Sequence, residues 1–393
     1  MEMSGEGIHA LCDDALAEIL VRLPSESVLR CRAVCKSWRR ITTGSSFLAA
    51  HAARRPVEMI TLTQSWTVSA VPLSPDLDVA DDGARRRYLC DPSLYGSDGA
   101  WTDWCRLLAS LDGLLVLRQR AGLYIVCNPT TRQWTNLPVL ARRPCSAAFP
   151  CGFYYHSPSG EYRLLCHAEE EEYTAAGCSS SRKDYYYTLS AGSTLPRRLA
   201  RAPADRPIQM GYESPVAHRG ILYWFCLHPE ATRTGKMLAF GTDSETFRLM
   251  SRPPTGDTSS SATLLVLDGA LCALATQDGE LLDIWVLRDG GCGAAESWTL
   301  RHRVVMTPPP PPRCSPYGRD FLPSTAISAG GGAILVGGCT SSVVRLYDLK
   351  EKRVKEMQLH STPTFLMFSE SLVSHAFFQA PRCPELAPLK FPD

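Results

Sequence analysis

The chain has 393 residues, with 41 Lys and Arg against 40 Asp and Glu, so its formal net charge is +1 at pH 7. This length suits two or three domains, and the balanced charge gives no reason to expect nucleic acid or an anionic membrane as the main partner. The first ten residues lack a basic start and an apolar run, and no apolar stretch reaches the ~20 residues that span a bilayer. We therefore expect neither a signal peptide nor a membrane anchor.

Sixteen cysteines are scattered along the chain, several of them inside apolar runs, and no C-x-x-C pair is present. In a reducing compartment, Cys behaves as a small buried apolar residue. Cys31 and Cys35 are four residues apart, but no His or second Cys pair follows at the spacing of a zinc site. We expect a cytoplasmic or nuclear protein with no metal and no cofactor.

Residues 11–55 show helical periodicity and carry more apolar surface than so short a segment can bury. Asp13 is a suitable N-cap for a first helix, and Pro24 ends it. Ser25 can cap a second helix, and a third must end near Gly44. Three short helices in about 45 residues have a marginal core, so the surplus apolar surface predicts a partner. The apolar stripe of the first helix consists of Leu16, Ile19, Leu20 and Leu23.

The same segment contains eight Lys or Arg and four Asp or Glu, a local balance of +4. A basic helix can bind nucleic acid, but apolar residues interleaved at helical spacing fit a protein partner better, preferably an acidic one. The other interpretation is a helical subdomain that packs on the rest of the chain.

The order of residues in this segment resembles an F-box, the module that docks a substrate receptor onto a Skp-type adaptor of cullin-based ubiquitin ligases. The family pattern is Leu-Pro, an acidic pair, a run ending in Glu-Ile-Leu, then Arg-Leu-Pro and Val-Cys-Lys-x-Trp-Arg. The chain departs from it at Cys12, where Pro is usual, and at Ala15, where a larger aliphatic residue is usual. Both departures weaken the first turn of the expected docking face. The matching residues are Leu11, Asp13, Asp14, Glu18, Ile19, Leu20, Arg22, Leu23, Pro24, Val34, Cys35, Lys36, Trp38 and Arg39.

The resemblance implies that apolar residues of this segment contact the adaptor. Some of them must form the segment's own core, and the sequence does not separate the two roles. The predicted docking residues are Leu11, Leu16, Ile19, Leu20, Leu23, Pro24, Val28, Leu29, Val34, Cys35 and Trp38.

After Arg55, short β-rich runs separated by Gly, Pro, Asp and Ser replace the helical periodicity. One unit recurs: a Gly, an apolar strand, a second strand, a polar turn, and an aromatic or apolar residue before a Pro or a basic run. Repeats of about 50 residues made of strands are typical of propeller blades of the kelch kind. Residues 57–73 can supply a further blade and residues 364–378 can close the ring, which predicts about six blades. The copies begin at Gly113, Gly160, Gly220, Gly269 and Gly332, with intervals of 47, 60, 49 and 63 residues.

The turn Asn128-Pro129-Thr130-Thr131-Arg132 is predicted to link two antiparallel strands and to present Trp134 for packing. Its setting, between a Gly-Leu-Leu run and Leu-Pro, resembles the plant F-box-associated domain, and this resemblance extends over residues 109–378. The predicted domains are a disordered N-terminus at 1–10, the F-box at 11–55, a linker and first β elements at 56–108, the F-box-associated propeller-like domain at 109–380 and a C-terminal tail at 381–393.

No nucleotide-binding, hydrolase or zinc-protease motif is complete in the sequence. His167 precedes four glutamates at 169–172, and we interpret this run as a solvated loop rather than a metal site. The prolines at 308–312 are interpreted as a stiff spacer rather than a ligand for an SH3 or WW domain. The cluster at 185–187, three tyrosines, is predicted to be a strand with alternate faces buried.

The predicted fold is α+β and multidomain: a small three-helix F-box followed by an all-β propeller-like domain. The resemblance implies a non-catalytic substrate receptor of a Skp–cullin–F-box ubiquitin ligase, which binds the adaptor, and through it the cullin, and holds a target protein. The alternatives are an F-box protein that acts outside a ligase, and a propeller enzyme similar to a kelch-type oxidase, which would bind a metal or cofactor. Because a β repeat domain buries its own core, we expect the helices to offer their apolar faces to the adaptor rather than to the propeller.

Overall fold

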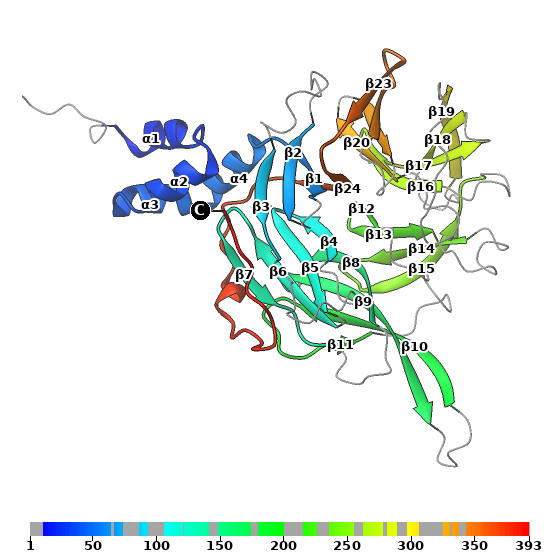
Figure 1. Cartoon of the computed structure of the whole chain (residues 1–393), viewed down its shortest axis with the longest axis horizontal. Coiled ribbons are helices and arrows are strands. Elements are labelled where there is room, and N and C mark those ends of the chain that lie inside the picture. The colour runs from blue at the N-terminus through cyan, green and yellow to red at the C-terminus, as the bar shows by residue number, and fades with distance from the viewer. Residues whose placement is uncertain are drawn as a thin grey trace, which may run out of the picture.

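A small helical domain lies at one side of a ring of strands in the computed structural model (Figure 1). The predicted disordered N-terminus and the prolines at 308–312 lie outside the described residues. The structure describes residues 11–63, 67–73, 86–92, 106–120, 122–140, 148–173, 180–199, 215–225, 236–254, 262–277, 281–288, 297–305, 325–330, 332–337 and 343–392.

The helical domain has four helices and not the predicted three. Gly44 ends one helix and precedes the next, because its extended backbone (φ −65°, ψ 141°) interrupts the helical hydrogen bonds. The Ala-rich run that follows favours a further helix, and its buried residues Phe47 and His51 are one turn apart. The helices are α1 (Asp13–Leu20), α2 (Ser25–Cys31), α3 (Lys36–Thr43) and α4 (Ser45–Ala53).

The N-caps predicted at Asp13 and Ser25 each lie one residue too late in the sequence. Cys12 and Pro24 occupy the N-cap positions, so Asp13 and Ser25 are the first helical residues. Neither N-cap side chain makes a capping hydrogen bond. Instead of capping, Asp13 pairs with a basic residue of α3, and Ser25 contacts the C-terminal part of the chain.

The strands form six four-stranded antiparallel sheets, which are the blades of a propeller (Figure 1). This confirms the predicted all-β domain and its six blades. The strands of each blade are given from the centre of the ring outward. Blade 1 has β24 (Thr362–Phe368), β1 (Glu58–Leu62), β2 (Val68–Pro72) and β3 (Arg87–Cys90), and blade 2 has β4 (Arg106–Leu111), β5 (Leu114–Arg120), β6 (Leu123–Asn128) and β7 (Gln133–Asn136). Blade 3 has β8 (Ala148–His156), β9 (Glu161–Tyr173), β10 (Ser180–Ser190) and β11 (Arg197–Arg198), and blade 4 has β12 (Val216–His218), β13 (Ile221–Phe225), β14 (Lys236–Gly241) and β15 (Thr246–Ser251). Blade 5 has β16 (Ala262–Leu267), β17 (Ala270–Gln277), β18 (Leu281–Arg288) and β19 (Ser297–Val305), and blade 6 has β20 (Thr325–Gly330), β21 (Ala333–Gly337), β22 (Val343–Asp348) and β23 (Arg353–Gln358).

Blade 1 joins the two ends of the propeller sequence. β24 pairs antiparallel with β1, and Glu58 lies opposite Phe368 in this ladder. The predicted closure of the ring by residues 57–73 and 364–378 is therefore confirmed. The closing strand ends at Phe368, however. The described residues beyond it form the short 3₁₀-helix Ala376–Gln379 and no further strand.

The five repeated glycines lie in the turns between the first and second strands of blades 2 to 6. Each has φ between 70° and 87°, the left-handed region that glycine adopts without strain. In three of these turns the preceding residue, Asp112, Arg219 or Asp268, also has a positive φ, as a two-residue type I′ hairpin requires. The repeat unit read from the sequence therefore starts one strand late, because each copy omits the innermost strand of its blade.

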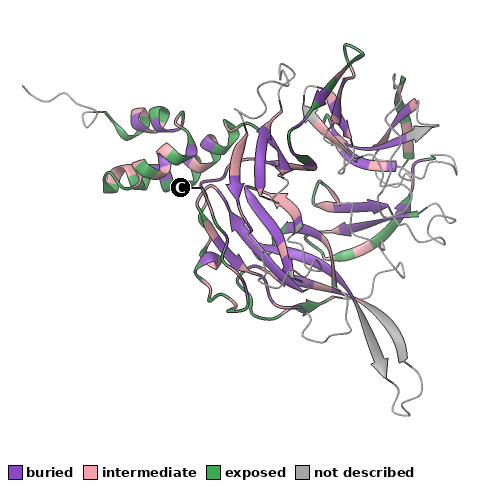
Figure 2. Ribbon diagram, viewed as in Figure 1, coloured by how far each residue is buried: buried purple, intermediate pink, exposed green. Residues whose placement is uncertain are grey.

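The propeller core is divided into six clusters, one between each pair of neighbouring blades. A strand covered on both faces reads as a continuous apolar run, and β6 is buried along its whole length. Figure 2 shows buried residues along most strands of blades 1 to 3, whereas the helical domain keeps much of its surface exposed.

The residues after Gln379 pack against blades 1 and 2. Leu386 and Leu389 are buried in the cluster between these blades. Gln119 exchanges two hydrogen bonds with Ala387: its Nε2 donates to the carbonyl (2.7 Å), and its Oε1 accepts from the amide (3.0 Å). The segment described from the sequence as a tail thus contributes to the propeller core.

Candidate functional site: the surface of the helical domain

The predicted docking residues fall into three groups by burial. The buried group, which belongs to the core of the helical domain, is Leu16, Leu20 and Val28. The partly buried group is Leu23, Leu29 and Trp38. The exposed group is Leu11 (40%), Ile19 (44%), Val34 (58%), Pro24 and Cys35. The structure thus separates two roles that the sequence left together, and the exposed group carries the prediction of adaptor contact.

Exposed apolar side chains are concentrated in this domain. The described part of the chain exposes ten large hydrophobic side chains, and three of them, Leu11, Ile19 and Val34, lie within the first three helices and their flanks. The helical domain therefore exposes more large apolar side chains than its share of the described residues predicts.

The departure from the F-box pattern at Cys12 leaves the start of α1 in place. Cys12 has φ −66° and ψ 159°, which is the backbone conformation that proline would impose. Its carbonyl accepts the amide hydrogen of Leu16 at 3.0 Å, as a normal first turn requires. The other departure, Ala15, is partly buried within the same turn.

The helical domain also exposes several basic side chains. Arg30 pairs with Glu26 (2.5 Å), and Arg40 pairs with Asp13. The hydrogen bond from Arg40 lowers the pKa of the Asp13 carboxyl. The described surface remains basic, which suits an acidic partner. The exposed cations of the domain are Arg22, Arg30, Lys36, Arg39, Arg40 and Arg54.

The helical core is completed by a residue from the far end of the sequence. We call residues 369–373, which directly follow β24, the junction segment. Leu372 is 3% exposed and lies in one cluster with Leu20, Val28 and Phe47. The expectation that the helices would not pack on the propeller chain is therefore wrong: part of their apolar surface is covered in cis.

Polar contacts also hold the junction segment against both domains. Glu370 pairs with Arg87 (Oε1 to Nη1, 2.7 Å), and its other oxygen accepts a hydrogen bond from Ser25 of α2. Arg32 Nη2 donates to the carbonyls of Thr42 (2.9 Å) and Leu372 (3.2 Å). Burial lowers the pKa of the Arg32 guanidinium.

Asn128, predicted only to shape a turn, also anchors the junction segment. Its Oδ1 accepts from the amides of Thr130 (3.0 Å) and Thr131 (3.2 Å). Its Nδ2 donates to the carbonyls of Ser371 (3.0 Å) and Val373 (3.1 Å), and the side chain is fully buried. The sequence held no signal for this second role, because the partners are backbone groups about 240 residues away.

A sequence profile of the F-box domain matches residues 8–49, and a profile of the F-box associated beta propeller domain matches residues 97–380. The second match spans more than half of the chain. The chain belongs to the F-box-associated β-propeller family. Both the F-box and the plant-type propeller that the sequence resembled are therefore confirmed.

Relatives of this F-box protein include F-box proteins of Arabidopsis thaliana. F-box protein At3g07870 is 26% identical over 320 residues, which cover 76% of this chain and 74% of the relative. F-box protein CPR1 is 22% identical over 379 residues, which cover 89% of this chain and 85% of the relative. Among solved structures, a chain of a nidogen/laminin complex covers 80% of this chain and 98% of its own length, at 12% identity and a TM-score of 0.45.

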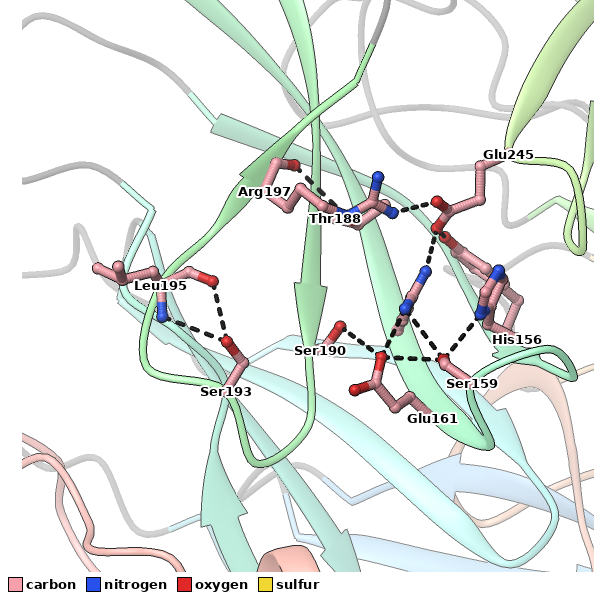
Figure 3. A network of polar contacts seen from close by, with 11 residues as sticks. His156, Ser159, Glu161, Thr188, Ser190, Ser193, Leu195, Arg197 and Glu245 are labelled. Atoms are coloured by element: carbon pink, nitrogen blue, oxygen red, sulfur yellow. Dashed lines mark hydrogen bonds and ion pairs between the residues drawn. The ribbon is translucent and has the colours of Figure 1, made fainter.

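A polar cluster where blades 3 and 4 meet brings carboxylates, arginines and a histidine of the F-box protein together (Figure 3). Glu245 Oε1 accepts from the Tyr154 hydroxyl (2.6 Å) and Arg163 Nη1 (2.7 Å), and Oε2 pairs with Arg197. Burial raises the pKa of Glu245, but these donors outweigh it and leave the pKa below its ordinary value. A carboxylate held ionised by three donors ties the two blades together and is poorly suited to act as a base.

The remaining sequence predictions concern blade 3 and metal binding. His167 is buried and packs against Phe149 and Tyr186, with ring centroids 6.3 and 5.3 Å apart. The glutamates at 169–172 belong to strand β9 and pair with residues 181–184 of β10, so the interpretation of this run as a loop is wrong. Their side chains lie outside the described part. Tyr186 is buried between two partly exposed tyrosines, which confirms the predicted alternation.

No group of three or more His, Cys, Asp or Glu side chains is placed to hold a metal ion within the described ranges. No helix in this part of the chain is both long and apolar enough to span a bilayer.

Proposed function

We propose that this F-box protein is the substrate-recognition subunit of a Skp–cullin–F-box ubiquitin ligase. The observation that carries the proposal is an F-box with exposed apolar residues, joined through buried contacts to a six-bladed propeller. The F-box docks on the Skp-type adaptor and through it on the cullin, and the propeller holds a target protein.

The proposed mechanism is positional and needs no catalytic group in this chain. A target held by the propeller meets the ubiquitin-loaded conjugating enzyme at a raised effective concentration, which replaces a bimolecular encounter by an intramolecular one. The Glu245 carboxylate, which accepts hydrogen bonds from Tyr154, Arg163 and Arg197, fits this non-catalytic role. We place the protein in the cytoplasm or nucleus, in line with its nine described cysteines, none of which forms a disulfide.

Co-elution with a purified Skp-type adaptor and cullin tests the proposal. The double variant Ile19→Asp/Val34→Asp puts two charges on the exposed apolar surface and should lose the adaptor, because a buried unpaired carboxylate is costly. Leu249→Asp is the matched control, because the exposed fraction of Leu249 (41%) is similar to that of Ile19 (44%), but Leu249 lies on β15 of the propeller. The control should bind like the wild type.

Three results would contradict parts of this proposal. A wild-type chain that does not retain the adaptor would refute the ligase function. Retention of the adaptor without the cullin would favour an F-box protein that acts outside a ligase. Normal binding by the double variant would remove the exposed residues from the docking surface.

A further inference from the structure

Closure of the propeller ring and attachment of the F-box meet at one residue pair. Glu58 begins β1, shortly after α4, and Phe368 ends β24, directly before the junction segment. These two residues lie opposite each other in the β1–β24 ladder. The pairing that closes the ring therefore also delivers the junction segment to the helices.

Leu372 then supplies a part of the F-box core that the helices lack. Leu20, Val28 and Phe47, which share its cluster, come from α1, α2 and α4, so Leu372 belongs to a core built from three helices. A domain of about 45 residues has little core to spare. Removing one buried leucine from such a core takes away a large share of its stability.

A chain of charges couples the same elements. Arg87 of β3 pairs with Glu58 at the start of β1 and with Glu370 of the junction segment, and Glu370 accepts from Ser25 at the start of α2. The side chains of Glu58 and Glu370 are 8% and 17% exposed, so solvent screens these pairs little. Arg87 also lies over the ring of Phe368, 5.6 Å from its centroid.

We propose that the F-box is stably folded only when the propeller ring is closed, because only a chain whose β24 is paired with β1 completes the F-box core through residues 369–373. An unclosed or partly unfolded propeller would leave the helices without Leu372 and Glu370, and they would open locally. The consequence for adaptor recruitment rests on the proposed function. It means that a receptor unable to hold a target would also be unable to join the ligase.

Hydrogen–deuterium exchange on the full-length chain tests the coupling without any partner. Leu372→Ala should speed exchange of the amides of α1, α2 and α4 by about 10-fold or more, and leave β24 and blades 2 to 5 near the wild-type rate. Leu271→Ala is the matched control, because Leu271 is a buried leucine that packs between blades 4 and 5, away from the β1–β24 pair. It should speed exchange around blades 4 and 5 and spare the helices.

A second variant keeps the test decisive if Leu372→Ala disturbs the whole chain. Glu370→Gln preserves the size of the side chain but removes the charge that pairs with Arg87, and it should also raise exchange in α2. Equal protection of the helices in wild type, Leu372→Ala and Glu370→Gln would overturn the proposal. Faster helix exchange in Leu271→Ala, equal to that in Leu372→Ala, would also overturn it.

Titration with the purified adaptor extends the test to function. Leu372→Ala should weaken adaptor binding by about 10-fold or more, although Leu372 is buried, whereas Leu271→Ala should not. Unchanged binding by Leu372→Ala would overturn the proposal that adaptor binding depends on the junction segment. Failure of the wild type to bind would refute the proposed function, while the exchange result would still decide the coupling.

Discussion

Replacing Asn128 by Asp changes one group of atoms and separates the two tasks of this side chain. The Oδ1 atom that accepts the amides of Thr130 and Thr131 is retained. The Nδ2 group that donates to the carbonyls of Ser371 and Val373 becomes an oxygen. The turn keeps its acceptor, and only the anchor of the junction segment is lost.

The size of the effect follows from the buried contacts. Two donated hydrogen bonds contribute about 0.5–1.5 kcal/mol each, and buried acceptors left without donors cost about 1–3 kcal/mol more. We therefore expect Asn128→Asp to lower the free energy of unfolding by about 3–5 kcal/mol at pH 8. Burial beside two carbonyl oxygens raises the pKa of the introduced carboxyl in the folded state. Protonation then stabilises the folded variant, so its deficit should shrink as the pH falls.

Urea unfolding followed by tryptophan fluorescence at pH 8 and pH 5.5 measures both effects. Asn136→Asp is the control, because its Oδ1 accepts the Cys383 amide (2.8 Å) and Asp retains this acceptor. The control should lose about 1 kcal/mol or less. Equal losses in the two variants, or a deficit of Asn128→Asp that does not shrink in acid, would refute the anchoring role.

Three further predictions concern backbone fit, pH and a buried charge. Gly113→Ala should lower the melting temperature more than Gly269→Ala: both glycines have positive φ, but a Cβ at Gly113 would lie 2.3 Å from the Ser371 Cβ, whereas no atom lies within 4 Å at Gly269. Burial lowers the pKa of His51, so the unfolded chain binds its proton more readily and stability should fall as the pH drops below 6.5; His51→Gln should flatten this dependence in melts from pH 7.5 to 5.5, and an unchanged slope would contradict it. Arg303→Ala should lower the urea midpoint more than Arg30→Ala, which breaks an exposed pair with Glu26, because it leaves the fully buried Asp283 carboxylate without its cation; equal midpoints would contradict this.

The sequence predicted the elements whose signals are local. The signals for the first helices and the order of the F-box residues lie within a few turns of one another. The end of α1 was less exact: it ends at Leu20, before the predicted stop at Pro24, so Leu23 lies outside it. The repeat could be recognised from its glycines, because each inner hairpin of blades 2 to 6 needs a residue with left-handed backbone at that position. The fourth helix was missed because Gly44 was read as the end of the helical region, although its extended backbone also suits the residue before a new helix.

Burial within the F-box was beyond the sequence for a different reason. Leu20 and Ile19 are adjacent apolar residues with equal claims to a docking role, but a helix turns them to different sides. Leu20 lies in the core and Ile19 is exposed. Only the packing of the other helices and of Leu372 against α1 decides which side is the core.

By itself, then, the sequence determined an F-box followed by a ring of about six β blades, because periodicity, turns and capping act over short distances. Tertiary structure decided how the two parts join. The contacts of Glu370, Leu372 and Asn128 link residues that are more than 200 positions apart. Contacts at such a separation produce no periodic pattern in the sequence. These contacts exist only once the last strand has closed the ring.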